Sequence, residues 1–205
     1  MRSHPLLLLA VASACLRTQE TPVATFGTTV AISSGLQGNL YLLSPYTEEL
    51  PNLKRMRPVG AIYTTSLQIW PRNFQQGFPG ITDRFEWFAI DYTGRFWVEK
   101  PGVYRFRLLS DDGSKLYIND KTLIDNDGTH APEAVDGSAH FSRGVHRIRV
   151  SYFQGPRSHV ALVLSVAGPD TDTWTIFDTN NFQPPTDPDE WLPGKIRNVK
   201  QGSNL

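Results

Sequence analysis

The chain has few of the features on which small secreted scaffolds, nucleic-acid-binding proteins and membrane-spanning proteins rely. It has a single cysteine among 205 residues, Cys15, so no disulfide can form within the chain. Its 20 basic and 20 acidic residues cancel, whereas binding to nucleic acid usually needs a basic surface. The apolar run from Leu6 to Ala14 is too short to cross a bilayer as a helix. We therefore expect no nucleic-acid partner and no spanning segment.

The first fifteen residues have the pattern of a targeting segment. Arg2 precedes the apolar run, and small residues lead to Cys15, which predicts a signal peptide at residues 1–14. The end of this segment, residues 11–15, resembles a bacterial lipobox, in which the cysteine is acylated, although Ala12 stands where leucine is usual. We predict lipidation of Cys15, with ordinary secretion as the alternative. Residues 15–34 would form a tether, and the membrane would be reached only through the lipid anchor.

Alternating apolar and polar residues, rather than a helical period, dominate the remainder of the chain. Tyr104, Phe106 and Leu108 alternate with Arg105 and Arg107, as in a half-buried antiparallel strand. Sixteen glycines and 15 prolines indicate many turns. Strands are predicted at 35–43, 62–70, 84–92, 94–98, 103–109, 116–118, 123–124, 145–153 and 160–166.

These segments predict an all-β fold, an antiparallel barrel or sandwich over residues 35–169. Residues 170–205 would form a short irregular C-terminal extension that packs on the domain. Trp174, Phe177 and Trp191 would be its packing residues, and the chain from residue 195 on would be a loose tail.

Acidic residues are concentrated after the predicted strand 103–109. Asp111 and Asp112 precede Gly113, and a second cluster, Asp125-Asn126-Asp127-Gly128, follows within one hairpin. Neighbouring side chains of a strand point to opposite faces, so one cation can use both aspartates only if the backbone turns sharply, which Gly113 permits. Hard oxygen ligands on short loops suit Ca²⁺, which takes about 6 to 8 oxygens. Ordinary turn chemistry is the alternative explanation.

Two histidines lie near these elements. His130 is in the predicted loop from Asp125 to Asp136, where it is either a ligand-binding residue or part of the surface. His146 shares the apolar face of Ile148 in the predicted strand 145–153. We interpret His146 as a partly buried structural residue.

Several of these segments, in order and spacing, resemble successive strands of a PA14 domain. They are Pro101 to Phe106, Ser110 to Ile118, Leu123 to Asp125 and Gly144 to Gly155. The resemblance covers roughly residues 35 to 170 and implies a barrel-like β module of the kind found in secreted toxins, glycosidases and adhesins. Many PA14 domains bind carbohydrate.

The resemblance also implies a site. In lectin-like PA14 domains an adjacent Asp pair, often joined by a cis peptide, holds a Ca²⁺ ion whose coordination the vicinal hydroxyls of a sugar complete. Asp111 and Asp112 match that pair, and Gln154 is the nearest candidate for the side-chain oxygen normally supplied by a late loop. Asp125, Asn126, Asp127 and His130 would add ligand contacts. This implies an extracytoplasmic, calcium-dependent module for a glycan or a cell-surface polysaccharide.

Two other functions are alternatives to this one. In a metal-free structural or docking module, the acidic turn would only cap a hairpin and the loops would contact another protein. A glycosidase needs two carboxylates roughly 5 to 10 Å apart across a cleft, which adjacent aspartates do not provide. The Ser and His residues lie in no recognisable nucleophile motif. The sequence therefore predicts a protein that is not an enzyme.

Overall fold

The computed structural model describes residues 35–81, 86–157 and 159–186. The predicted signal peptide, the lipidation site Cys15, the tether, Trp191 and the tail lie outside these residues. The described chain is all-β, with three short 3-10 segments, at Leu53–Arg55, Phe74–Gln76 and Thr179–Phe182. No helix within it is long and apolar enough to span a membrane. The strands are β1 Leu36–Leu42, β2 Gly60–Thr64, β3 Gln68–Asn73, β4 Phe88–Val98, β5 Gly102–Asp111, β6 Ser114–Ile118, β7 Lys121–Asn126, β8 Glu133–Phe141, β9 Gly144–Gln154, β10 His159–Ala167 and β11 Thr175–Ile176.

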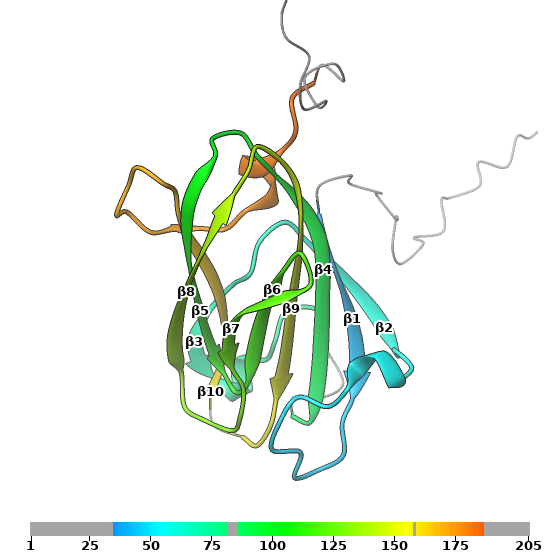
Figure 1. Ribbon diagram of the computed structural model, residues 1–205. Coiled ribbons are helices and arrows are strands. Elements are labelled where there is room, and N and C mark those ends of the chain that lie inside the picture. The colour runs from blue at the N-terminus through cyan, green and yellow to red at the C-terminus, as the bar shows by residue number, and fades with distance from the viewer. Residues whose placement is uncertain (1–34, 82–85, 158, 187–205) are drawn as a thin grey trace, which may run out of the picture. The chain divides into compact units, whose positions relative to one another are not determined.

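The strands form two antiparallel sheets that lie face to face (Figure 1). One sheet has the order β2-β1-β4-β9-β6-β7, and the other has the order β11-β10-β5-β8 with β3 also paired to β10. The sheets do not close on each other, so of the two architectures expected from the sequence, the sandwich is the one found.

The core between the sheets follows the predicted alternation. Phe106 and Leu108 of β5 are fully buried, while the side chains of Arg105 and Arg107 lie on the outer face. His146 is buried and contacts the Asn119 side chain at 2.9 Å and the Ser142 carbonyl at 2.8 Å. The structural role predicted for this histidine is thus supported by its contacts.

A second, smaller core lies on the other face of the six-stranded sheet, at one end. Ala89 and Phe153 point away from the main core because their neighbours Phe88, Ile90 and Tyr152 point into it. The segment that follows β1 covers these two residues. The buried members of this second core are Tyr41, Leu43, Leu53, Ala89 and Phe153.

Three strand assignments made from the sequence were wrong. The predicted strand 62–70 is two strands, because β2 pairs with β1 in one sheet and β3 with β10 in the other, so the chain crosses between sheets. The predicted strands 84–92 and 94–98 are one strand, β4, which continues through Gly94. A glycine is needed there because a Cβ would lie 2.7 Å from a Leu36 methyl carbon. Strand β8 begins within the predicted loop 125–136, where its partly exposed side chains give no apolar alternation.

The C-terminal extension contributes to the main core. Phe177 is fully buried, and its ring lies 5.4 Å from that of Phe96 and 6.0 Å from that of Phe106. Trp174 lies outside, beneath the guanidinium groups of Arg105 and Arg107 at 5.4 and 4.5 Å. Of the three predicted packing residues, the two that are described both pack on the sandwich.

Candidate functional site

The acidic turn and the end of β9 meet at one end of the sandwich. β5 ends at Asp111, and β9 ends at Gln154, which pairs with Phe88 at the start of β4. The Gly113 carbonyl accepts a hydrogen bond of 2.9 Å from the Phe153 N–H, which fixes the turn against β9. The peptide bond between Asp111 and Asp112 is cis. The site is therefore built from both sheets, with Asp111 from one and Gln154 from the other.

Asp112 is buried, and both of its carboxylate oxygens accept hydrogen bonds. Oδ2 accepts from the Gly155 N–H at 2.7 Å and from Gln154 Nε2 at 3.3 Å. Oδ1 accepts from the His130 N–H at 3.2 Å. Burial raises the pKa of Asp112, and the two backbone hydrogen bonds act against that rise. The carboxylate is thus held in a fixed orientation by two segments, the end of β9 and the loop between β7 and β8.

Asp111 is only 1% exposed, and its Oδ2 atom has no hydrogen-bond partner among the described residues. Burial, and then the neighbouring charge of Asp112, raise the pKa of Asp111 to about 6. A buried carboxylate oxygen without a partner is costly and rare in folded proteins. This oxygen is accordingly the atom of the site whose bonding is incomplete.

The Tyr152 hydroxyl has one proton but two acceptors within hydrogen-bond distance, the Asp111 carbonyl and Gln154 Oε1. The Tyr152 hydroxyl lies 2.7 Å from the Asp111 carbonyl oxygen and 2.6 Å from Gln154 Oε1. Burial raises the pKa of this phenol well above its usual range, so it stays protonated, but one hydroxyl can donate only one hydrogen bond. One of the two oxygens is therefore left without that proton.

The second acidic cluster has partners of its own. Lys115 Nζ lies 3.1 Å from Asp125 and 3.0 Å from Asp127, and Asp127 Oδ1 also accepts the Leu50 N–H at 2.9 Å. Asn126 is buried and donates to Ser110 Oγ at 3.0 Å. These contacts position the loops around the site, while a direct contact of Asp125, Asn126 or Asp127 with a ligand stays a prediction.

His130 is partly buried, with its ring nitrogens facing two carbonyl groups. Nδ1 lies 2.9 Å from the Ala131 oxygen and Nε2 lies 3.1 Å from the Asn126 oxygen. Burial lowers the pKa of His130, but these two hydrogen bonds, together with the negative charges of Glu133 and Asp112, outweigh it and raise the pKa above its usual value. Its backbone N–H, rather than its ring, is what contacts Asp112.

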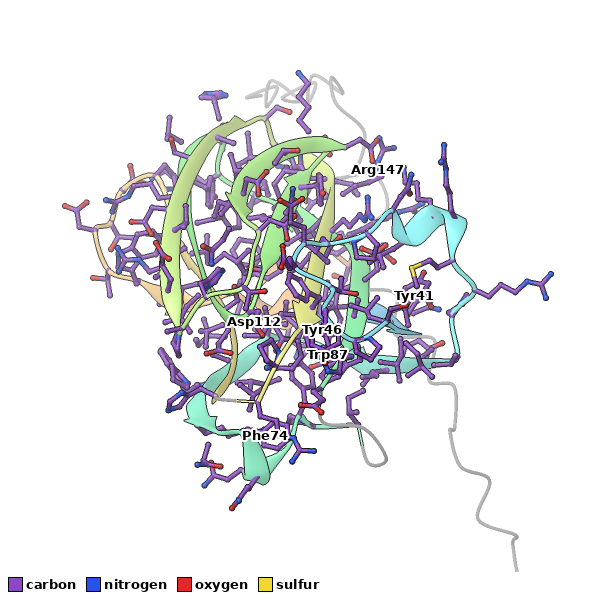
Figure 2. All side chains as sticks on the ribbon, turned by 90° about the horizontal axis from the view of Figure 1, so that it is seen from below. Tyr41, Tyr46, Phe74, Trp87, Asp112 and Arg147 are labelled. Atoms are coloured by element: carbon purple, nitrogen blue, oxygen red, sulfur yellow. The ribbon has the colours of Figure 1, made fainter. Side chains whose placement is uncertain are left out.

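Sequence reasoning missed two aromatic residues at this end of the molecule, Tyr46 and Trp87. The Trp87 N–H donates to the Gln154 carbonyl at 2.8 Å, and the Tyr46 ring lies 5.9 Å from the Trp87 ring. Figure 2 shows both residues at the same end as Asp112. The only sequence signal was an aromatic residue within a polar loop, Ser44 to Asn52.

The site has no further cluster of ligating side chains. In the described ranges, no three side chains of the His, Cys, Asp or Glu type come together in a way that could hold a metal ion. A cation at Asp111 and Asp112 would therefore take its remaining ligands from amide and carbonyl oxygens and from water.

Comparisons with known proteins agree with this architecture. The family model described as "PA14 domain" matches residues 76–179, half of the chain. The structure is similar to the PA14 domain of the MpAFP antifreeze protein, with 15% identity and a TM-score of 0.58 over 72% of this chain and 88% of that one. No curated protein sequence matches the chain.

Two similar structures are of a sugar-binding domain and of a domain with a bound sugar. One is a PA14 sugar-binding domain from an RTX adhesin, with 16% identity and a TM-score of 0.56 over 72% of this chain and 96% of that one. The other is the Epithelial Adhesin 9 A domain from Candida glabrata in complex with Galβ1-3GlcNAc, with 15% identity and a TM-score of 0.53 over 72% of this chain and 87% of that one. At these identities the likeness concerns the fold.

Proposed function

This chain belongs to the PA14 domain family, and we propose that it is an extracytoplasmic, non-enzymatic module that binds a glycan or a cell-surface polysaccharide through Ca²⁺ held by Asp111 and Asp112. The observation that carries the proposal is the buried Asp111 Oδ2 atom, which lies beside a second carboxylate and has no hydrogen-bond partner in the described part of the chain. A cation would satisfy this oxygen and offset the repulsion between the two aspartates. The sugar-binding domain of the RTX adhesin and the sugar-bound adhesin domain, both similar in structure, support the same class of ligand.

Gln154 fits as a further ligand if its side-chain amide is turned by half a turn. Nε2 would then donate to the Tyr152 hydroxyl, which would in turn donate to the Asp111 carbonyl. The single proton of Tyr152 would then have a single acceptor. Oε1 would face Asp112 Oδ2 and also the His159 carbonyl oxygen, to which Nε2 otherwise donates at 3.1 Å. Three such oxygens are favourable together only with a cation among them. The donor set is thus all oxygen, as Ca²⁺ requires.

The chain's own residues hold this site in position. The Gly155 and His130 amides orient Asp112, and the Tyr152 hydroxyl supports the Asp111 backbone. When bound, Ca²⁺ would supply coordination positions for the vicinal hydroxyls of a sugar. Selection among glycans would then depend on the loops around the site.

A metal-free structural or docking module is the second candidate function. It is favoured by the contacts of Asp112, whose two oxygens both have hydrogen-bond donors without any cation. Under this alternative the loops at the site end would contact another protein, and a chelator would change neither the fold nor binding.

Isothermal titration calorimetry with CaCl₂ tests the metal directly. We expect one Ca²⁺ per chain, with weaker binding by Asp111→Asn and by Asp112→Asn, since each removes one negative charge and keeps the shape of the side chain. Asp136→Asn is the matched control, because it also removes one carboxylate charge. The Asp136 carboxylate pairs with Arg107, which precedes Asp111 by four residues on β5. No uptake at millimolar Ca²⁺, or unchanged binding by both site variants, would favour the metal-free module.

Anchoring needs its own test. We propose that Cys15 is lipidated and that the protein is held at the membrane by this lipid, with secretion as the alternative. Mass spectrometry of the membrane fraction should find a modified N-terminal Cys15. An unmodified N-terminus elsewhere would exclude the anchor and leave the glycan proposal untouched.

A further inference from the structure

Tyr46 is exposed to an unusual degree for a large side chain. Among the exposed large hydrophobic residues of the described chain it keeps 86% of its surface in solvent, and the next, Val59, keeps 58%. Its backbone φ is 68°, and that of Trp87 is 60°. Bulky residues rarely adopt this region, and outliers of this kind cluster at functional sites. Both aromatic side chains are thus presented by an uncommon backbone conformation.

The two residues are connected to the carboxylate pair. Asp112 contacts the Gln154 side chain at 3.3 Å, and the Gln154 carbonyl accepts the Trp87 N–H at 2.8 Å. The rings of Trp87 and Tyr46 lie 5.9 Å apart and are tilted by 49°. Trp87 itself packs on the second core and so gives Tyr46 a firm support. Figure 2, which views the molecule from below, labels Asp112, Tyr46 and Trp87 in the same region of the view.

The loop that carries Tyr46 is held in place without a ligand. Thr47 Oγ1 donates to the Ser44 carbonyl at 2.7 Å, and the Leu50 N–H donates to Asp127 Oδ1 at 2.9 Å. The second bond ties this loop to the acidic loop that follows β7. A surface that is already positioned loses little conformational freedom when a ligand binds.

We propose that Tyr46, supported by Trp87, is a stacking platform for a second sugar unit, so that the ligand is a disaccharide or a longer chain. This inference rests on the proposed glycan function. The electron-rich face of an aromatic ring suits the C–H face of a pyranose, and aromatic side chains commonly line ligand sites. Because Gln154 and Trp87 stand between Asp112 and Tyr46, the sugar over Tyr46 is not the one whose hydroxyls approach the carboxylates.

The test measures affinity against glycan length in Ca²⁺. The probes are glucose, galactose and mannose, together with disaccharides and trisaccharides built from them, on a printed array and then in titration calorimetry. Tyr46→Ala should weaken binding of the longer probes roughly five- to tenfold and leave the monosaccharides unchanged. Tyr46→Phe should keep wild-type affinity, because the ring is retained. The matched control is Tyr63→Ala, whose tyrosine is 56% exposed on β2.

The outcomes separate this inference from the proposed function. If the wild-type protein binds the probes and Tyr46→Ala has no effect, or weakens monosaccharides as much as longer chains, the platform is refuted and the glycan function stands. If the wild-type protein binds none of the probes with or without Ca²⁺, the glycan function and the platform are both refuted. Circular dichroism of each variant establishes that the fold is retained.

Discussion

At the scale of single residues, deprotonation of Asp111 lowers the stability of the folded protein in the absence of metal. Its pKa in the folded protein is raised to about 6 by burial and by Asp112, above the value for an exposed aspartate. As the pH rises, the unfolded chain therefore loses this proton before the folded protein does. The contribution of Asp111 to stability is greatest below the unfolded pKa and is lost as the pH rises through about 6.

We therefore predict that Asp111→Asn changes the pH dependence of stability. Without Ca²⁺, the free energy of unfolding of the wild type should fall between about pH 4 and pH 7, by at most about 3 kcal/mol from this residue. The Asn variant should lack this component, and Ca²⁺ should remove it from the wild type. Urea unfolding at several pH values, with EDTA or with Ca²⁺, measures the effect. If the free energy of unfolding of the variant falls with pH as steeply as that of the wild type, Asp111 is not the source of the pH dependence.

The sequence identifies some residues of the site and not others. Asp111 and Asp112 stand out because two carboxylates next to a glycine form a local pattern. Tyr46 and Trp87 do not, because they reach Gln154 only through strand pairings between segments far apart in the sequence. That Asp111 Oδ2 finds no hydrogen-bond partner among residues 35–81, 86–157 and 159–186 is likewise a result of packing, which no local pattern reports.

At the scale of elements, two loops depend on one carboxylate. Asp127 accepts the Leu50 N–H and the Gly128 N–H and pairs with Lys115, and its side chain is 12% exposed. Asp125 pairs with the same lysine but is 56% exposed, and its Oδ1 atom accepts the Asp127 N–H at 3.2 Å rather than the Leu50 N–H. The two aspartates thus provide a matched pair of sites.

We predict that Asp127→Ala loosens the loop that carries Tyr46, whereas Asp125→Ala does not. The Leu50 amide would lose its acceptor and should exchange its hydrogen faster in the first variant only. Asp127→Ala should also lower the free energy of unfolding by about 1–3 kcal/mol, since two partly buried donors, the Leu50 and Gly128 amides, lose their acceptor. Hydrogen exchange by mass spectrometry or NMR measures the first effect. Equal exchange at Leu50 in both variants would refute the role of Asp127.

Strands with clear alternation were predicted well, and the rest depended on sheet context. β5 and β9 were predicted nearly to their ends because one face of each is apolar. The break between β2 and β3 was missed because both segments favour strands, and only their different partners separate them. β8 was missed because, at the edge of its sheet, it has little apolar burial.

At the scale of the whole molecule, the chain beyond β10 completes the core. Phe177 is fully buried between the sheets and stacks on Phe182 at 5.1 Å, while Trp174, only three residues earlier, lies on the outer face. A domain that ended at residue 169, the boundary expected from the sequence, would lack this aromatic cluster.

We predict that Phe177→Ala lowers the free energy of unfolding by about 3–5 kcal/mol, the cost of removing a fully buried aromatic side chain. Trp174→Ala is the control and should cost about 1–2 kcal/mol, because only contacts with two surface arginines are lost. Thermal or chemical denaturation followed by near-ultraviolet circular dichroism provides the comparison. Similar losses in the two variants would mean that Phe177 is not part of a cooperative core.

The course of β1 bears on how the protein would respond to pulling. β1 runs from Leu36 to Leu42, and Leu42 pairs with Phe88, which pairs with Gln154, so the described chain enters at the end opposite the site. A tension between a surface held at the site and the chain before β1 would act along this strand. β1 forms hydrogen bonds with β2 on one edge and with β4 on the other. Because hydrogen bonds between antiparallel strands lie across the strand direction, this tension would load all of them at once rather than break them one after another. Anchored from this side, the sandwich would resist mechanical extension.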